Sequence, residues 1–393
     1  MKGIKKNMIN NLVKQFTEAF GENEYKIRRF FSPSRINIIG EHIDYNGGKV
    51  FPCPLEIGTY GIARKNDSNK LRLKSLNMDT QGEISLEDPK YIEENDWMNY
   101  AAGMLKFIAD EGYHTGGLDI LVYGDIPNGA GLSSSASLEL LIGEIVNQIY
   151  NDGDIQKENL ALIGKKTENE FIGLNSGIMD QFIIAVGKKD HATLIDTNTL
   201  DYHHIPFQLD DTTIVILNTN KRRELKDSKY NERRSECDLA LEILKPFKPE
   251  ITTLCDLTEE DLPLLENIED LNVRKRAEHA IRENARVNKA VDALESNDIE
   301  TLGSLLVQSN DSLRELFEVT GPHLDSITKH ANDFEHCLGA RMTGAGFGGC
   351  GISIVKNDYI EDFKEYVSKG YKDDTGLDAQ FIISQVGNGV HEL

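Results

Sequence analysis

The sequence predicts an α/β protein with two domains. Its 393 residues are enough for two domains of ordinary size with hydrophobic cores. Short apolar segments typical of strands and long amphipathic segments typical of helices occur in both halves. The composition shifts between Asp201 and Asp211, which predicts one domain over residues 1–205 and a second, helix-rich domain over residues 206–393.

Hydrophobic periodicity gives the individual elements in order. The spacing of apolar residues predicts helices over residues 8–20, 97–112, 138–149, 156–171, 178–186 and 229–243, with further helices between 273 and 333. Apolar runs predict strands within residues 26–79 and at 118–123, 213–217 and 350–355. The longest uninterrupted apolar run, residues 182–186, is far too short to cross a bilayer.

The overall charge limits the kinds of partner. A formal net charge of -22 and a pI near 4.9 disfavour nucleic acid and anionic membranes, because the field of the whole molecule repels both. The five cysteines include no C-x-x-C pair, and the basic N-terminus is followed by an amphipathic segment rather than by the apolar core of a signal peptide. We therefore expect a cytoplasmic protein with reduced thiols. The sequence does not determine the oligomeric state, and a monomer is expected.

A glycine- and serine-rich segment, residues 123–137, connects the predicted strand 118–123 to the predicted helix 138–149. Glycines in such a loop allow a ligand to approach the backbone closely. The serine hydroxyls and the N–H groups at a helix N-terminus together favour an anion, most naturally a polyphosphate. No lysine follows the glycines, so the segment is not a P-loop. The alternative is a connection in which serine only caps the helix.

An acidic turn lies within residues 34–48. Ile36 and Ile38 alternate with polar residues as in a strand, and Gly40 then ends the strand. Four polar residues crowd into the turn that follows: Glu41, His42, Asp44 and Asn46. Carboxylates suit a sugar, because each oxygen accepts hydrogen bonds from hydroxyl groups and charged acceptors make stronger bonds. The alternative is a hairpin that faces water.

Three further features carry chemistry. Glu168 shares a helix face with apolar residues, so it either reaches water or binds a divalent cation such as Mg²⁺ together with a serine hydroxyl. Asp180 points away from the apolar stripe of its helix, toward solvent or a cleft. Residues 343–349 match G-x-G-x-x-G but precede a strand, whereas the dinucleotide fingerprint opens a helix. A second glycine loop in close contact with a ligand is therefore expected there, and a nicotinamide-dependent oxidoreductase is disfavoured.

These segments together resemble a known family. Residues 35–48, 129–137 and 343–349 resemble the three motifs of the GHMP kinase superfamily, and residues 40–46 are similar to the galactokinase signature. Residues 175–181 match the same family, so the resemblance covers essentially the whole chain. It implies a ribosomal-protein-S5-like N-terminal domain and an α/β C-terminal domain, with the active site in the cleft between them. It also implies ATP-dependent phosphorylation of the C1 hydroxyl of α-D-galactose, with Mg²⁺ as cofactor, giving galactose 1-phosphate and ADP.

The resemblance also assigns roles by position. The proton acceptor falls on Asp180 and the arginine that stabilises the transition state on Arg35. The sugar contacts fall on Glu41, His42, Asp44, Gly177, Asp180 and Tyr230. The phosphates of ATP would lie along Gly129, Ala130, Gly131, Leu132, Ser133, Ser134 and Ser135, and Ser75 matches a further nucleotide contact. Mg²⁺ would be held by Ser135 and Glu168.

The sequence departs from the family pattern at Ser34, Ile43 and Ser176, where glycine, threonine and cysteine are usual. None of these changes removes a charged catalytic group, so they concern specificity rather than the reaction. Two alternatives stay open: a kinase acting on a related sugar such as N-acetylgalactosamine, and a non-catalytic sensor of galactose and ATP. Intact Ser135, Asp180 and Arg35 argue against the sensor.

Overall fold

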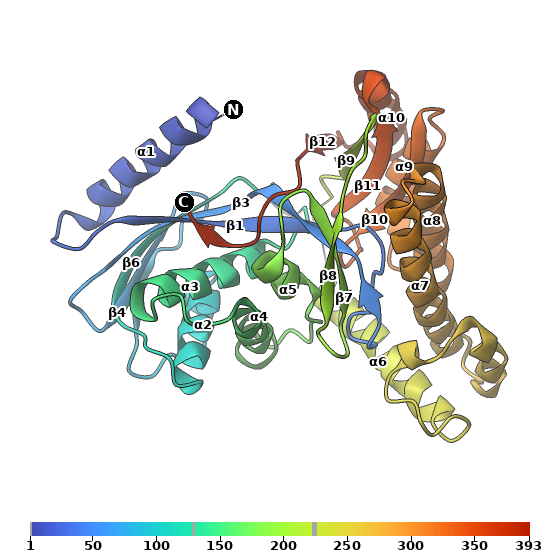
Figure 1. The fold of residues 1–393 in the computed structure, drawn as a ribbon, viewed down its shortest axis with the longest axis horizontal. Helices are drawn as coiled ribbons and strands as arrows, with labels where there is room; N and C mark the ends of the chain where they lie inside the picture. The colour runs from blue at the N-terminus through green and yellow to red at the C-terminus, as the bar shows by residue number, and fades with distance from the viewer. Residues whose placement is uncertain (1, 128–129, 222–225) are drawn as a thin grey trace.

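The fold is that of a computed structural model, which describes residues 2–127, 130–221 and 226–393. Within these ranges the strands form three sheets, and helices pack around them (Figure 1). No helix of the described ranges is both long enough and apolar enough to span a membrane.

The largest sheet has six strands and belongs mainly to the first half of the chain. Its order is β13-β1-β3-β6-β4-β5, and the neighbouring strands are antiparallel except for the parallel pair β4 and β6. The strands are β1 (Arg28–Asn37), β3 (Pro52–Lys65), β4 (Lys70–Ser75), β5 (Gly82–Ser85), β6 (Leu118–Gly124) and β13 (His391–Glu392). Helices α2 (Met98–Asp110) and α3 (Ser134–Tyr150) lie on one side of this sheet, and α1 (Lys2–Phe20) lies on the other (Figure 1).

A three-stranded sheet and two helices complete the first half. The sheet has the order β2-β7-β8, formed by β2 (Lys49–Val50), β7 (His191–Asp196) and β8 (Tyr202–Pro206). Helix α4 (Lys157–Lys166) continues into a single π-helical turn, Thr167–Ile172, and α5 (Met179–Val186) follows.

The second half is built around a four-stranded antiparallel sheet of order β10-β11-β9-β12. Its strands are β9 (Thr212–Asn218), β10 (Cys337–Thr343), β11 (Cys350–Lys356) and β12 (Gln380–Ile383). The helices are α6 (Lys226–Leu244), α7 (Leu271–Glu295), α8 (Ile299–Ser312), α9 (Gly321–Asn332) and α10 (Ile360–Thr375). A π-helical turn, Leu313–Phe317, follows α8, and short 3-10 turns occur at Glu93–Asn95, Leu254–Asp256, Glu259–Asn267 and Asn357–Tyr359.

We propose that the domain boundary lies at the end of β8, with residues 1–205 in the first domain and residues 206–393 in the second. The first two sheets precede this point, except for β13, which returns from the C-terminus to pair with β1. The four-stranded sheet lies entirely beyond it. The last residues of the chain therefore attach the second half to the first.

Most predicted elements are present with bounds shifted by a few residues, but one helix differs in kind. The predicted helix over residues 156–171 ends as an α-helix at Lys166, and residues 167–172 form the π-helical turn. A π-helical turn adds a residue to the helical repeat and often occurs at functional sites. Periodicity could not reveal it, because the turn ends the helix at Ile172 and no helical residues follow to show a shifted apolar pattern.

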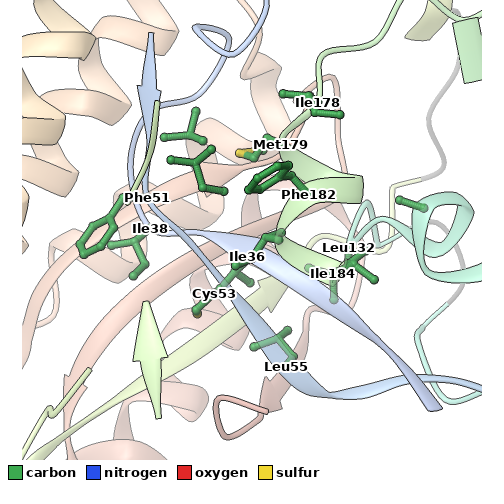
Figure 2. Packing of buried hydrophobic residues seen from close by; sticks show 14 of the residues in the cluster. Ile36, Ile38, Phe51, Cys53, Leu55, Leu132, Ile178, Met179, Phe182 and Ile184 are labelled. Atoms are coloured by element: carbon green, nitrogen blue, oxygen red, sulfur yellow. The ribbon is translucent and has the colours of Figure 1, made fainter. Parts of the chain in front are cut away.

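A continuous hydrophobic cluster lies beneath the junction of β1, β3 and α5. Figure 2 shows side chains of β1 and β3 gathered with those of α5, with Leu132 at the margin of the cluster. Ile36, Met179 and Phe182 are all buried in it. Because Met179 and Phe182 anchor α5 on its apolar side, Asp180 projects from a fixed helix end on a different side.

Candidate active site

One cavity of about 400 Å³ gathers residues from segments that are far apart in the sequence. Its lining comes from the end of β1, the acidic turn, the glycine-serine loop, the π-helical turn, α5, α6 and the loop before β11. The predicted site residues that line it are Arg35, Glu41, His42, Asp44, Ala130, Gly131, Leu132, Ser133, Ser134, Ser135, Glu168, Gly177, Asp180 and Tyr230. Gly129 lies outside the described residues.

Arg35 and Asp180 form a bidentate ion pair at the centre of this lining. Arg35 Nε donates to Asp180 Oδ1 and Arg35 Nη2 to Asp180 Oδ2, both at 2.7 Å. Arg35 Nη1 also donates to the carbonyl oxygen of Gly131 at 3.2 Å, and Ser133 Oγ donates to Asp180 Oδ2. The Arg35 side chain is 4% exposed, whereas that of Asp180 is 31% exposed. The guanidinium is therefore a fixed support, and the carboxylate is the partner that faces the cavity.

The serines of the glycine-serine loop do not cap α3. Ser133 occupies the N-cap position with φ 60° and ψ 49°, and its side chain makes no capping hydrogen bond. Its hydroxyl turns to Asp180 instead, and Ser134 is exposed at the first position of the helix. A left-handed backbone at a residue other than glycine is strained and commonly marks a functional site. The interpretation of this loop as a mere cap is therefore wrong for Ser133.

Ser135 and Glu168 lie together, as the predicted metal pair requires. Ser135 Oγ donates to Glu168 Oε1 at 2.9 Å. Glu168 is buried on the π-helical turn, and its other oxygen accepts a 2.6 Å hydrogen bond from Ser176 Oγ. The alternative that Glu168 reaches water is therefore wrong. Two hard oxygen donors side by side fit Mg²⁺, which commonly takes few protein ligands and completes its shell with phosphate oxygens and water.

The acidic turn is buried, so the water-facing hairpin is also wrong. Glu41 is 1% exposed, and its Oε2 accepts a 2.8 Å hydrogen bond from Asn37 Nδ2. Its Oε1 accepts from Thr343 Oγ1 at 3.1 Å and from the Gly344 backbone N–H at 2.7 Å, and it pairs with Arg341 Nη2 at 3.0 Å. Glu41 therefore joins the acidic turn to the glycine loop before β11, besides lining the cavity.

His42 is held as a neutral imidazole. Its Nε2 lies 3.2 Å from the carbonyl oxygen of Ala345, which can only accept, so Nε2 carries the proton. Its Nδ1, 2.8 Å from the Tyr45 hydroxyl, therefore accepts. Burial lowers the pKa of His42 to about 3, with a contribution from nearby His279. With φ at 62°, His42 also shapes the bend that carries Glu41 and Asp44.

Asp44 and Gly177 lie against each other in the cavity lining. Burial and the charge of Asp180 raise the pKa of Asp44 to about 6, although the Met179 backbone N–H donates to it. A Cβ atom added at Gly177 would lie only 1.7 Å from Asp44 Oδ2. Glycine is thus the residue that allows Asp44 to sit against the loop before α5.

Replacing Gly177 by alanine should therefore displace Asp44. We expect the Michaelis constant for the sugar to rise about tenfold or more, because a charged hydrogen-bond acceptor is moved out of place. The Michaelis constant for ATP should change little. Gly82→Ala is a matched control, since a Cβ there meets the flexible Met98 side chain at ordinary contact distances, 3.4 Å to Cε and 3.9 Å to Sδ. Unchanged sugar kinetics in Gly177→Ala would contradict this role for the glycine.

Tyr230 brings the second half of the chain to the cavity. It lies on α6, with its ring centroid 5.5 Å from that of His42 and 5.6 Å from that of Tyr45. Burial, together with the charges of Asp44 and Asp180, raises its pKa well above the usual value. The hydroxyl therefore stays protonated and can donate a hydrogen bond to a ligand.

Among the predicted site residues that the structure describes, Ser75 is the one that does not line the cavity. It ends β4, and its Oγ accepts hydrogen bonds from the backbone N–H groups of Asn77 and Met78. Ser75 pairs with Val122 on β6, and Asn77 holds Gly124 by two side-chain bonds of 2.7 and 2.9 Å. The segment thus supports the start of the glycine-serine loop, and the nucleotide contact of Ser75 stays a prediction.

Sequence reasoning missed several residues of the lining. Ser176 was noted only as a departure from the family, yet its hydroxyl holds Glu168. Gly344 and Ala345, in contrast, belong to the loop of residues 343–349, for which the sequence predicts close contact with a ligand, and both line the cavity. The sequence does not reveal the bonds that their backbone atoms make to Glu41 and His42. Tyr100, from α2, also lines the cavity, although its sequence gives only a helical apolar signal.

Comparisons with known proteins agree with this arrangement. The galactokinase galactose-binding signature matches residues 14–65, the GHMP kinases N terminal domain matches residues 99–188, and the GHMP kinases C terminal region matches residues 290–373.

Whole-chain relatives extend the match. The galactokinase of Clostridium tetani is 50% identical over 386 residues, which is 98% of each chain. The galactokinase of Ligilactobacillus salivarius is 51% identical over 394 residues, covering 99% of this chain and 100% of the relative. The crystal structure of Lactococcus lactis galactokinase complexed with galactose matches with a TM-score of 0.95 and 41% identity, over 98% of this chain and 100% of that one. The predicted two-domain fold is thereby confirmed, and the chain belongs to the galactokinase family of GHMP kinases.

Proposed function

We propose that this protein transfers the γ-phosphoryl group of ATP to the C1 hydroxyl of α-D-galactose, giving α-D-galactose 1-phosphate and ADP. The observation that carries this proposal is the position of Asp180. It is held by Arg35 and Ser133 in a cavity that the acidic turn and the glycine-serine loop both line. A sugar on the acidic turn and a triphosphate on the loop would meet at this carboxylate.

Asp180 and Arg35 take the central roles in the reaction. The C1 oxygen of galactose attacks the γ-phosphorus, the bond from that phosphorus to the β–γ bridging oxygen breaks, and the hydroxyl proton passes to Asp180. Arg35 fixes the orientation of the Asp180 carboxylate through one hydrogen bond to each oxygen. It also adds positive charge beside the transferred group. In a loose transition state, positioning and charge neutralisation contribute more than the strength of the base.

We propose that the sugar is contacted by residues of the acidic turn, by Gly177 and by Tyr230. Glu41 and Asp44 would accept hydrogen bonds from sugar hydroxyls, and Tyr230 would donate one. His42 and Gly177 would shape the pocket, the first by its bend and the second by leaving room for Asp44. Sites built from buried polar groups reject ligands that leave those groups unpaired, which favours one hexose over its isomers.

ATP would bind along the glycine-serine loop, with its phosphates at Ala130 to Ser135 and near the positive end of α3. Gly129 and Ser75 are proposed to complete the nucleotide contacts. Ser135 and Glu168 would hold Mg²⁺, and the cation when bound would neutralise phosphate charge. Ser176 keeps Glu168 turned toward Ser135 through its 2.6 Å hydrogen bond.

Galactose binding should weaken as the pH falls through about 6. The raised pKa of Asp44, about 6, means that its carboxylate takes up a proton below that pH and becomes a weaker acceptor for sugar hydroxyls. Calorimetric titration with galactose from about pH 8 to about pH 5 would measure this loss of affinity. Asp44→Asn should bind weakly at every pH and lack this dependence. A wild-type affinity that stays constant across the range would contradict the role of Asp44.

The reaction is tested by a panel of sugars with ATP and Mg²⁺, measuring ADP release and the position of the new phosphate. We expect galactose to give the 1-phosphate with the highest kcat/KM. The alternatives of N-acetylgalactosamine as preferred substrate and of a non-catalytic sensor are not favoured, because the three relatives described above, which are 41% to 51% identical, are galactokinases. A higher kcat/KM for N-acetylgalactosamine, or no ADP release with any sugar, would overturn the proposal.

We further propose that the enzyme works in the cytoplasm as a monomer. The five cysteines are reduced, as is usual for proteins of a reducing compartment. Size-exclusion chromatography with light scattering would test the monomer.

A further inference from the structure

Helix α7 of the second half contacts the acidic turn from outside the cavity. Glu283 is fully buried, and its Oε1 accepts a 3.0 Å hydrogen bond from the backbone N–H of Gly40. Ser309 and Arg286 donate to the same carboxylate, at 2.6 and 2.8 Å. Gly40 has φ 105°, and a Cβ there would lie 3.0 Å from Val287 Cγ2, so the turn lies directly against the helix.

Two more side chains of α7 bond to backbone atoms of the turn. His279 Nε2 lies 3.1 Å from the carbonyl oxygen of Glu41, which can only accept, so this nitrogen donates and Nδ1 accepts from Ser312 Oγ at 2.8 Å. Asn284 Oδ1 accepts a 2.9 Å hydrogen bond from the backbone N–H of Lys49. The helix therefore binds the backbone at both ends of the turn.

Other bonds also hold the turn. The backbone N–H groups of Asn46 and Gly48 donate to the Ile43 carbonyl, and the Glu41 carboxylate and the His42 ring are bonded as described above. Strand β1 ends at Asn37, and β2 is only the two residues Lys49–Val50, so no long ladder runs through the bend. Within the bend, His42 has a left-handed backbone that must be held by its surroundings. The bonds from α7, a helix of 25 residues, add to that support at Gly40, Glu41 and Lys49.

We propose that Glu283, His279 and Asn284 are positioning residues for galactose. They hold the backbone at Gly40, Glu41 and Lys49, and thereby place the carboxylates of Glu41 and Asp44 that would receive the sugar. This inference rests on the proposed function. The glycine-serine loop, in contrast, lies between β6 and α3 and receives none of these three bonds. Removing these bonds between α7 and the acidic turn should therefore weaken galactose binding and leave ATP binding nearly unchanged.

The first test compares two asparagines on neighbouring turns of α7. Asn284→Ala removes the acceptor for Lys49 N–H and the 3.2 Å bond to the Cys255 carbonyl. Asn288→Ala is the matched control, because Asn288 is exposed and meets only the Lys49 ammonium and the Asn284 carbonyl, each at 3.3 Å. We expect the galactose Michaelis constant to rise about fivefold to tenfold in Asn284→Ala and to stay at the wild-type value in Asn288→Ala.

Glu283 gives a second test with a conservative rescue. Glu283→Ala removes the acceptor for Gly40 N–H and should raise the galactose Michaelis constant about tenfold or more. Glu283→Gln keeps an oxygen at that place and should restore most of the affinity. Because Glu283→Ala also leaves Arg286 without its 2.8 Å partner, thermal unfolding must first show that it is folded. If it is not, the asparagine pair and Glu283→Gln decide the matter.

Kinetic constants for both substrates, together with calorimetry of galactose alone, separate the outcomes. A rise in the galactose constant with the ATP constant within about twofold supports the positioning role. Wild-type galactose constants in folded Asn284→Ala and Glu283→Ala, or equal rises for galactose and ATP, would overturn it. A wild-type enzyme that releases no ADP with galactose would instead refute the proposed function.

Discussion

Asp180→Ala should lower kcat with galactose about 10²-fold to 10⁴-fold, the range typical of a lost general base that also orients its substrate. The Michaelis constant for ATP should stay close to the wild-type value, because the glycine-serine loop is unchanged. Steady-state kinetics with a coupled ADP assay measures both constants. The structural reason is that Asp180 is the partly exposed member of the ion pair and faces the cavity.

Asp180→Asn is the control for folding. The alanine variant leaves Arg35, which is 4% exposed, without its carboxylate partner, and removing one partner of a buried pair costs a few kcal/mol. Asparagine keeps an oxygen for Arg35 Nε but cannot accept the proton. We expect it to be folded, to bind ATP and to be nearly as slow as the alanine variant. A kcat near the wild-type value in either variant would remove Asp180 from the mechanism.

Arg35→Ala should lower kcat by about 10³-fold, because an arginine that stabilises phosphoryl-transfer charge contributes on this order. Arg35 bonds both oxygens of Asp180 and also the Gly131 carbonyl, so its loss disorders the base and the phosphate loop together. Both kcat and the ATP Michaelis constant should therefore change. Pre-steady-state measurement of the phosphoryl-transfer step separates the chemical effect from binding.

Arg35→Lys distinguishes charge from geometry. Lysine keeps the positive charge but has no planar fork with which to hold both oxygens of Asp180. We expect a kcat between those of wild type and Arg35→Ala. If Arg35→Lys equals wild type, the bidentate geometry plays no part in the reaction. If Arg35→Ala equals wild type, Arg35 does not stabilise the transition state.

The elements around the site could be predicted largely from local sequence. The apolar spacing after Ser137 predicts α3, and the strand pattern after Gly349 rightly excludes a dinucleotide-binding fingerprint. The clustering of Glu41, His42 and Asp44 in one turn indicates either a binding site or a hairpin that faces water, and the burial of the turn decides between them. These signals are local, because they depend on residues a few positions apart.

The pairings between distant segments could not be predicted in this way. Arg35 and Asp180 lie 145 residues apart, and a strand residue gives no sign of which carboxylate it will meet. The π-helical turn that carries Glu168 ends its helix, so no later helical residues show a shift in the apolar spacing. The serine-rich sequence after Gly131 fits both a helix cap and a phosphate-binding loop. The structure distinguishes the two, because the Ser133 hydroxyl donates to Asp180 rather than to the helix.

The support of the acidic turn by α7 was also beyond sequence reasoning. Glu283 lies 243 residues from Gly40, and its helix has the ordinary charged pattern of a surface helix. Its charge would suggest solvent contact, yet the side chain is fully buried. Glu283 can be buried because Gly40, Ser309 and Arg286 donate hydrogen bonds to its carboxylate. A buried carboxylate is stable only when its oxygens are hydrogen-bonded in this way.

A crystal structure of the protein with galactose, Mg²⁺ and a non-hydrolysable ATP analogue tests the central claim most directly. We expect both ligands in the one cavity, with the C1 hydroxyl within hydrogen-bond distance of Asp180 and in line with the γ-phosphorus beside the glycine-serine loop. Galactose and nucleotide in separate cavities, too distant for transfer, would contradict it.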